Sequence, residues 1–540
     1  MPTTHAPDPT PAPPGAPAVA RGTVVVGDDP LTVEQVVDVA RHGARVRLAD
    51  EALAAMAASR AVVDALADDD RPHYGVSTGF GALARRHIPV DRRAQLQTSL
   101  VRSHAAGSGP EVETEVVRAL QLLRLATLAT GRTGARPVVA QTYAAMLDAR
   151  VTPVVREHGS LGCSGDLAPL AHVALAALGE GEARDASGTP RPAADVLADA
   201  GIAPLVLREK EGLALLNGTD GMLGMLCLAL HDLRGLLRTA DVAAALSVEA
   251  LLGSDAPFAA DLVALRPHPG QAASAANLRA LLAGSPVVAS HRTLDAQGRP
   301  ECTRVQDAYS LRCAPQVHGA ARDTLDHAAV VAGHELAAAI DNPVVTADGR
   351  VESNGNFHGA PVAYVLDFLA IAAADVASIS ERRTDRFLDR ARNEGLPPFL
   401  ADDPGVDSGL MIAQYTAAGI VSELKRLAVP ASVDSIPSSA MQEDHVSMGW
   451  AAARKLRRAL DGLAQVLAVE LLAATRALDL RTAGTLRPAH GTGAVRDAVR
   501  AVVAGPGPDR YLAPEIEAVT RLVARGDVTA TADAAVGPLA

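Results

Sequence analysis

Five long stretches rich in alanine, leucine and valine dominate the middle of this 540-residue sequence. Each is longer than an ordinary helix, and several are apolar around most of the circumference, as helices at the centre of a bundle are. Aromatic residues make up only 2% of the chain, which disfavours a strand sandwich. The sequence therefore predicts a mainly α-helical fold around a long central helix bundle, with helices over Met222–Leu252, Arg322–Ile340, Ala363–Arg382, Met411–Leu427 and His445–Leu478.

Short polar segments separate these stretches, and they hold most of the residues that could do chemistry. They are Gly253–Phe258, Arg304–His318, Ser353–Pro361 and Ser432–Asp444, and we expect them to be irregular. Binding and catalytic residues are often placed on loops that a rigid scaffold positions. The pattern thus indicates a helical scaffold with functional connections.

The region before the bundle has a different pattern, with short helices and two glycine-rich loops. Thr32 followed by Gln35 predicts a capping box that opens a helix. Further helices are expected over Thr114–Thr130 and Leu170–Leu178. The glycines within residues 74–81 and 159–165 predict loops.

These patterns divide the chain into four expected parts. Residues 1–22 form a disordered tail rich in proline and alanine, and residues 23–220 form a smaller mixed N-terminal region that carries the two loops. The central long-helix bundle covers residues 221–480, and residues 481–540 form a C-terminal helical region.

Charge and composition argue against several classes of partner. The formal net charge is −12, with 50 Lys and Arg against 62 Asp and Glu, which disfavours nucleic acid. Residues 1–19 lack the basic start and apolar run of a secretory signal. Asp367 and Asp375 interrupt the apolar stretch Ala363–Ile379, so we expect a buried helix there rather than a membrane span.

The four cysteines indicate neither a disulfide framework nor a metal site. Cys163, Cys227, Cys302 and Cys313 form no C-x-x-C pair and no cluster with zinc-ligand spacing. So few cysteines in so long a chain fit a reducing cytoplasm. We expect a cytoplasmic protein without a bound metal.

Residues 159–172 have the sequence GSLGCSGDLAPLAH, and this segment resembles the signature of the histidine and phenylalanine/tyrosine ammonia-lyases. In that family an Ala-Ser-Gly triplet cyclises to 4-methylidene-imidazol-5-one, an electrophile that needs no external cofactor. The resemblance assigns this role to Cys163-Ser164-Gly165.

The residue types suit such a cyclisation. The amide nitrogen of Gly165 would attack the carbonyl carbon of Cys163, and only glycine lets the backbone fold so tightly. One water is lost on ring closure, and a second leaves with the hydroxyl of Ser164. Cys163 stands where alanine is usual, but its side chain is only a substituent, so the ring should still form.

Further blocks resemble the same family in the same order along the chain. Two of them depart from the common pattern, with Ser77 where asparagine is frequent and Ala308 where proline is common, and Met441, just before the last block, also stands where asparagine is frequent. The blocks are Tyr74–Gly81, Ser103–Gly107, Leu215–Thr219, Val305–Cys313, Asn356–His358 and Gln442–Met448.

The resemblance implies a role for each candidate site residue. Tyr74 is the expected base that removes the β-proton, Tyr309 would hold or activate the amine, and Glu443 would share acid–base work. A tyrosine base requires a pKa lowered by positive charge or helix N-termini. The catalytic set is thus Tyr74, Cys163, Ser164, Gly165, Tyr309 and Glu443.

The expected substrate-binding residues surround this set. Arg312 would bind the substrate carboxylate with its planar fork, and His104 together with Glu443 would pair with an imidazole ring. Structural roles remain as alternatives for these residues. Arg312 could form a salt bridge with Asp307, and Phe357 or Met411 could simply pack in the core. The binding set is His104, Asn217, Gln306, Arg312, Phe357 and Met411.

The resemblance therefore implies an enzyme that converts L-histidine to trans-urocanate and ammonia. A tyrosine or phenylalanine ammonia-lyase, or a 2,3-aminomutase of the same family, is the nearest alternative. A catalytically inactive helical scaffold is the alternative of a different class. Family members assemble as homotetramers with shared active sites, so we expect the same here, with a small-molecule amino acid as ligand and neither nucleic acid nor membrane as partner.

Overall fold

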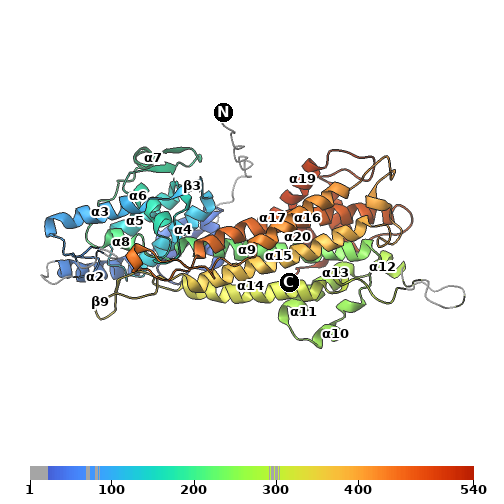
Figure 1. The fold of residues 1–540 in the computed structure, drawn as a ribbon, viewed down its shortest axis with the longest axis horizontal. Helices are drawn as coiled ribbons and strands as arrows, with labels where there is room; N and C mark the ends of the chain where they lie inside the picture. The colour runs from blue at the N-terminus through green and yellow to red at the C-terminus, as the bar shows by residue number, and fades with distance from the viewer. Residues whose placement is uncertain are drawn as a thin grey trace. The chain divides into compact units, whose positions relative to one another are not determined.

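The computed structural model describes residues 22–67, 73–79, 83, 86–290, 292, 297, 302 and 304–540. The tail expected over residues 1–22 lies outside them apart from Gly22, as do Phe80 and Gly81. Backbone contacts divide the chain into two compact units (Figure 1). The first unit is Met1–Gly159, Leu167–Gly221 and Ala338–Asn356, and the second is Ser160–Asp166, Met222–Ala337 and Phe357–Ala540.

The first unit combines helices with short strands. Its helices are α1 (Val33–Ala40), α2 (Asp50–Ala67), α3 (Arg93–His104), α4 (Thr114–Ala129), α5 (Pro137–Asp148), α6 (Leu167–Ala177), α7 (Ala193–Asp199) and α8 (Glu211–Ala214). Its strands are β1 (Thr23–Val26), β2 (Arg45–Leu48), β3 (Ser108–Glu111), β4 (Thr152–Pro153), β5 (Arg156–His158), β6 (Glu182–Arg184), β7 (Pro190–Pro192), β8 (Val344–Val345) and β9 (Val351–Glu352).

The strands form small separate sheets. β1 and β2 are parallel, with Thr23 opposite Arg45 and Val26 opposite Leu48. The other pairs are antiparallel: β3 with β5, β6 with both β4 and β7, and β8 with β9. Such short sheets cannot bury a core alone, so the helices supply most of it.

Local signals in the first unit determine where its helices begin. Thr32 accepts a hydrogen bond from the Gln35 amide at 3.2 Å, and the Gln35 side chain accepts one from the Thr32 amide at 2.9 Å. This is the predicted capping box at the start of α1, and it is confirmed. The predicted helices over Thr114–Thr130 and Leu170–Leu178 are confirmed as α4 and α6.

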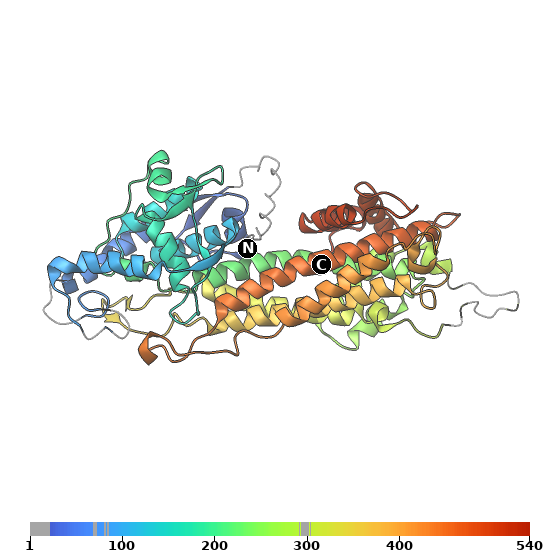
Figure 2. The ribbon, with the colours of Figure 1, turned by 45° about the horizontal axis from the view of Figure 1, so that its top comes forward.

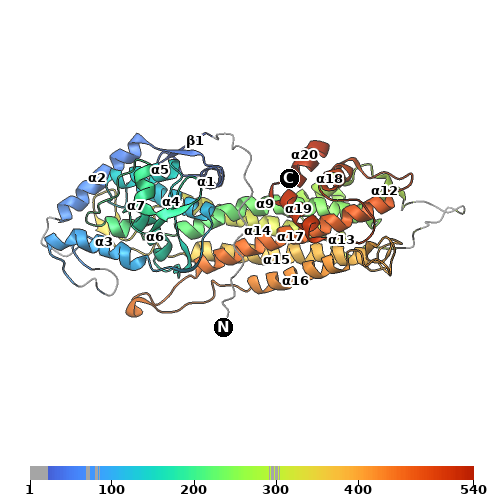
Figure 3. The ribbon, with the colours of Figure 1, turned by 90° about the horizontal axis from the view of Figure 1, so that it is seen from above.

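The second unit is built on long helices. They are α9 (Asp220–Ala250), α14 (Ala314–Leu336), α15 (Ala360–Leu388), α16 (Met411–Leu427) and α17 (Gly449–Arg481), and each matches one of the five predicted stretches. Figures 1 and 3 show α9, α14, α15 and α17 lying side by side. The mainly helical fold predicted from the sequence is confirmed.

Shorter helices cover this bundle. They are α10 (Ala260–Ala264), α11 (Pro269–Leu282), α12 (Pro286–Ser290), α13 (Tyr309–Arg312), α18 (His490–Arg500), α19 (Ala513–Ala524) and α20 (Asp527–Val536). Figure 2 shows the C-terminal helices, in red, lying against α17. The expectation of an irregular Arg304–His318 was wrong, because α13 and the first turn of α14 lie within it. Pro315 lies in that first turn of α14, where a missing N–H costs nothing.

A buried charge cluster joins three of the long helices. Glu470 of α17 accepts hydrogen bonds from Ser247 of α9 at 2.7 Å and from Ser380 of α15 at 2.6 Å. The guanidinium of Arg383, also on α15, pairs with both oxygens of the same carboxylate. Glu470 and Arg383 are fully buried, so this cluster fixes the register of the helices against one another.

Helix α15 is long and apolar enough to cross a membrane, yet it is packed like a core helix. Its most apolar window is 61% buried, and α14, α16 and α17 all contact it. Asp367 within it is buried and forms an ion pair with Lys455 of α17 at 2.7 Å. Because α15 packs against three helices and contains a buried ion pair, it agrees with the prediction of a buried helix at this position.

Candidate active site

The loop predicted over residues 159–165 is confirmed and lies between β5 and α6, and all three of its glycines have positive φ angles, with 147° at Gly159. The φ angle is 67° at Gly162 and 81° at Gly165. A Cβ added at Gly162 would clash with the hydroxyl of Ser447. Glycine is therefore required at Gly162 by both backbone conformation and space.

Hydrogen bonds from distant segments hold this loop in the second unit. The carbonyl of Leu161 accepts from the Met448 amide at 2.9 Å, and that of Gly162 accepts from the Ser447 hydroxyl at 2.8 Å. The buried carboxylate of Asp166 accepts from Ser160 at 2.8 Å and from the Met222 amide at 2.9 Å. The loop is thus fixed from the starts of α9 and α17.

The carboxylate of Glu443 lies against the two predicted reactive side chains of the loop. One oxygen is 3.2 Å from the sulfur of Cys163, and the other is 3.4 Å from the hydroxyl oxygen of Ser164. Ser438 donates a hydrogen bond of 2.8 Å to the first of these oxygens. The structure therefore brings together residues that are about 280 positions apart in the sequence.

A tight turn places Glu443 in this position. Ser439, Ala440 and Met441 all have positive φ angles although none is glycine. Ser438 and Glu443 close the turn, since the Ser438 amide donates to the Glu443 carbonyl at 2.8 Å. Non-glycine residues in this conformation are strained, and such strain clusters at functional sites.

The thiol of Cys163 stays protonated over a wide pH range. The side chain is buried, and burial together with the negative charge of Glu443 raises the pKa of Cys163 to about 12. A thiol in this state donates a hydrogen bond and is a poor nucleophile.

Tyr309 and Arg312 form a second pair, on α13. The guanidinium carbon of Arg312 lies 4.7 Å from the centre of the Tyr309 ring, a cation–π contact. Asp307 pairs instead with Arg304 at 3.1 Å. Among the described residues, the Nε atom of Arg312 is buried without a hydrogen-bond partner, so the guanidinium has donors left for a carboxylate.

The remaining predicted residues of the second unit are less closely tied to the loop. Phe357 is partly buried and precedes His358, whose ring stacks on that of His445 with centroids 5.7 Å apart. Gln306 is exposed, and Met411 is the partly buried first residue of α16. In the described part of the chain, no hydrogen bond or ion pair joins Gln306, Arg312 or Met411 to Cys163 or Ser164.

Tyr74, in the first unit, lies in a turn that Ser77 closes. The Ser77 hydroxyl accepts from the His73 amide at 2.9 Å, and the Ser77 amide donates to the His73 carbonyl at 2.9 Å. Gly75 has a φ angle of 74°, which the turn needs. The Ser77 side chain therefore stabilises the turn, at a position where asparagine was expected from the resemblance.

His104 is the last residue of α3, and its hydrogen bond fixes its tautomer. The Nδ1 atom lies 2.9 Å from the Leu100 carbonyl oxygen, which can only accept. Nδ1 must therefore carry the proton in the neutral ring, and Nε2 is the acceptor.

Asn217 is buried and held by main-chain contacts in the first unit. Its amide donates to the Asn342 carbonyl at 2.7 Å, and its own carbonyl accepts from Arg124 at 2.7 Å. Arg124 also forms an ion pair with Asp220 at 3.0 Å. The side chain of Asn217 is thus held through its amide group, and its backbone is held through its carbonyl.

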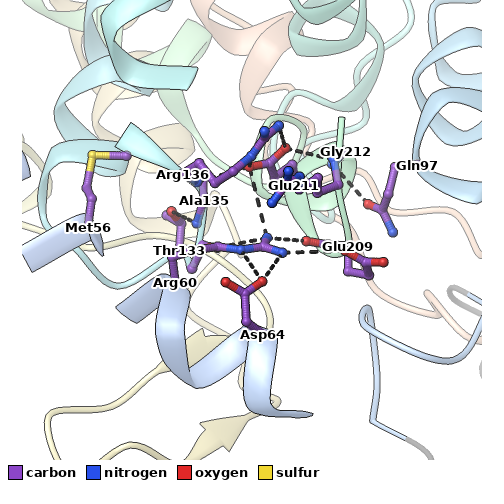
Figure 4. Close-up of polar contacts among 12 residues, drawn as sticks. Met56, Arg60, Asp64, Gln97, Thr133, Ala135, Arg136, Glu209, Glu211 and Gly212 are labelled. Carbon is purple, nitrogen blue, oxygen red and sulfur yellow. Dashed lines mark hydrogen bonds and ion pairs between the residues drawn. The ribbon is translucent and has the colours of Figure 1, made fainter. Parts of the chain in front are cut away.

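The segment that leads into Asn217 is anchored by the charge cluster in Figure 4. Glu211, at the start of α8, is fully buried and accepts three hydrogen bonds from Arg136, two of them at 2.7 Å. Arg60 lies beside it and donates to the Glu209 carbonyl at 2.8 Å (Figure 4). Sequence reasoning missed these residues, because nothing local shows that their charges are buried.

The described residues offer no group of three or more His, Cys, Asp or Glu side chains arranged to hold a metal ion.

Comparison with known proteins gives consistent matches. A family model described as aromatic amino acid lyase matches residues 31–501. The chain is 66% identical to a histidine ammonia-lyase of Streptomyces griseus over 519 residues, 96% of this chain and 100% of that protein. It is 49% identical to a histidine ammonia-lyase of Sorangium cellulosum, over 94% of this chain and 99% of that protein.

Solved structures of related proteins share the fold. A tyrosine aminomutase from Streptomyces globisporus has a TM-score of 0.90 at 40% identity, covering 95% of this chain and 99% of that chain. A histidine ammonia-lyase from Trypanosoma cruzi has a TM-score of 0.86 at 38% identity, covering 96% of each chain.

Proposed function

The chain belongs to the aromatic amino acid lyase family and is a carbon–nitrogen lyase, and from this premise we propose that it eliminates ammonia from L-histidine to give trans-urocanate. Glu443 carries the proposal, because its carboxylate lies within hydrogen-bonding distance of both Cys163 and Ser164. The 66% identity to a histidine ammonia-lyase supports the choice of substrate.

We propose that the family's prosthetic group, 4-methylidene-imidazol-5-one, forms here from Cys163, Ser164 and Gly165. The residues fit it: Gly165 lacks a Cβ and has the left-handed backbone of a tight turn, and the Ser164 side chain is only partly buried. When present, the group supplies an electron-poor alkene that bonds the substrate amine and makes it a better leaving group.

The hydrogen bonds of Ser160, Ser447 and Met448 suit a role in holding this triplet for ring closure. Preorganised backbone lowers the entropic cost of bringing the Gly165 nitrogen to the Cys163 carbonyl. The thiol of Cys163 is protonated and donates to Glu443. Because a protonated thiol is a poor nucleophile, it does not attack the electrophilic alkene proposed beside it.

Binding and proton transfer fall to the surrounding side chains in this proposal. Arg312, whose Nε has no partner in the described structure, binds the substrate carboxylate. Tyr74 removes the β-proton, and Tyr309 holds the amine. Asn217, Gln306, Phe357 and Met411 complete the pocket.

His104 and Glu443 favour an imidazole substrate. With its proton on Nδ1, His104 offers Nε2 as an acceptor for a ring N–H, and the Glu443 carboxylate is a second acceptor. A phenyl ring offers these groups no N–H, so it would forgo the hydrogen bonds that an imidazole could make, at a cost of roughly 1–3 kcal/mol each.

We further propose that the protein is a cytoplasmic homotetramer whose active sites draw residues from more than one subunit. Large apolar side chains on α15 stay exposed in the single chain, among them Tyr364, Phe368 and Ile371. A contiguous exposed apolar face indicates a protein interface. Four cysteines without disulfides fit a reducing compartment.

Intact mass and turnover test the proposal together. We expect the mature chain to lack the mass of two water molecules, and Ser164→Ala to retain that mass and lose activity. Cys163→Ala is the matched control, which should still lose both waters. A chain that is fully active with an unmodified Ser164 would contradict the proposal.

An aminomutase is the second candidate, favoured by the TM-score of 0.90 to a tyrosine aminomutase. Incubation with histidine, tyrosine and phenylalanine separately distinguishes the two. Urocanate absorbance from histidine alone supports the lyase, whereas a β-amino acid product supports the aminomutase.

A further inference from the structure

A cavity of about 240 Å³ in the first unit is lined by several arginines, and two of them lack a carboxylate partner. Arg41 pairs with Glu115 at 2.6 Å, and Arg184 pairs with Glu111. Arg118 and Arg150 form no ion pair with any described residue. Two guanidinium groups therefore line this cavity without a direct ion pair to a described carboxylate.

Arg118 is held rigidly and has donors to spare. It is only 5% exposed, and it donates to the Val39 carbonyl through Nε and Nη2 and to the Leu147 carbonyl through Nη1. A guanidinium has five N–H groups, so two remain for a ligand. Burial, followed by the charge of Arg150, lowers the pKa of Arg118 to about 10, against the opposing effect of Asp148.

Thr152 adds a hydroxyl donor to the cavity lining. Its side chain lines the cavity and is 3% exposed, and its hydroxyl makes no hydrogen bond with any described residue. Its backbone is fixed by pairing with Arg184 between β4 and β6. The hydroxyl can therefore donate to an oxygen of a ligand in the cavity.

The start of α4, whose first turn carries Glu115, also lies at the cavity. Thr114, the first residue of this 16-residue helix, lines the cavity, and no side chain caps the helix there. Helix N-termini favour anions. Two further groups line the cavity: His42, and Asp185, whose carboxylate accepts hydrogen bonds from Ser187 and Thr189.

We propose that this cavity binds the phosphate group of a small ligand, with Arg118, Arg150 and Thr152 donating to its oxygens. Guanidinium groups match phosphate oxygens in geometry and charge. The volume lies just below the range of pockets for drug-sized molecules, so a free phosphate ion or a small phosphate monoester fits the size. The site is separate from the residues of the proposed reaction.

Calorimetric titration of the full chain at constant ionic strength tests the proposal, with inorganic phosphate and glucose 6-phosphate as probes. We expect saturable binding of at least one probe. Arg150→Gln should weaken it about tenfold, because it removes one charged hydrogen bond. Tighter binding of glucose 6-phosphate would identify a monoester site, and equal binding a site for phosphate itself.

Arg45→Gln is the matched control. Arg45 is an exposed arginine of the same unit, it does not line the cavity, and its loss changes the net charge equally. Thr152→Val should weaken binding severalfold, with a thermal unfolding scan to confirm that the variant folds. Absence of saturable binding, or equal weakening by Arg150→Gln and Arg45→Gln, would overturn the proposal. If Thr152→Val does not fold, the exposed Arg150 still decides the outcome.

Discussion

At the scale of single residues, Gly162 shows most directly how the loop depends on its surroundings. Its φ angle is 67°, and an added Cβ would meet the hydroxyl of Ser447. The same Ser447 donates to the Gly162 carbonyl. One methyl group would therefore disturb both the backbone conformation and the contact that fixes it.

We predict that Gly162→Ala prevents loss of the two water molecules and abolishes activity, while the chain still folds. Intact-mass measurement and a thermal unfolding scan check this. Gly235→Ala is the control, since Gly235 lies within α9 and its added Cβ meets nothing within 4 Å. A fully processed Gly162→Ala protein would contradict the role of the loop geometry.

The raised pKa of Cys163 predicts slow alkylation. At pH 9 an ordinary thiol is half ionised, whereas a thiol with a pKa of about 12 is almost wholly protonated. Because the thiolate is the nucleophile, iodoacetamide should react with Cys163 at least roughly 100-fold more slowly in the native than in the denatured chain. Peptide mapping at several times measures both rates.

The raised pKa of Cys163 also makes the stability of the chain depend on pH. Between pH 9 and about pH 12 the native chain holds a proton that the unfolded chain releases, so the free energy of unfolding falls as the pH rises. Glu443→Gln removes the neighbouring negative charge and should lower the pKa of Cys163. We expect faster alkylation in Glu443→Gln at pH 9, and an unchanged rate would argue against the contact.

At the scale of elements, the long helices could be predicted from the sequence because their apolar runs are longer than any strand. Met411–Leu427 was predicted with the bounds of α16. The predicted irregular segment Arg304–His318 was wrong because its polar residues conceal α13 and the start of α14. Tertiary packing, which no local pattern shows, stabilises these helices.

The site could be predicted only as separate blocks of sequence. The contact of Glu443 with Cys163 and Ser164 depends on a strained turn and on the clamp from Ser447, which are long-range features. Buried charges such as Arg124 and Glu470 were missed for the same reason, since a charge in an apolar helix does not reveal its partner.

The cluster around Glu470 predicts a large loss of stability when it is broken. Glu470→Ala would leave the guanidinium of Arg383 buried without its carboxylate, at a cost of about 3–5 kcal/mol. Urea unfolding followed by circular dichroism measures this. Glu352→Ala, which removes an exposed ion pair with Arg350, should leave the midpoint unchanged. A small effect of Glu470→Ala would mean that the helices pack without this cluster.

At the scale of the whole molecule, the exposed apolar face of α15 predicts assembly. Phe368 is 45% exposed on this face. We expect Phe368→Asp to place a charge in the proposed subunit interface and to reduce the molar mass in light scattering. It should also lower activity, because the proposed active sites draw residues from more than one subunit. A fully active monomer would contradict the shared-site arrangement, and Phe368→Leu should keep the wild-type mass.

The clamp on the loop also bears on when the protein can mature. Leu161 and Gly162 are made early in translation, but Ser447 and Met448, which hold them, leave the ribosome almost 290 residues later. A nascent chain that has not yet reached the start of α17 contains Cys163, Ser164 and Gly165 but lacks the residues that hold their loop. The proposed ring closure would then have its full set of contacts only late in synthesis, and a chain truncated before α17 lacks those contacts.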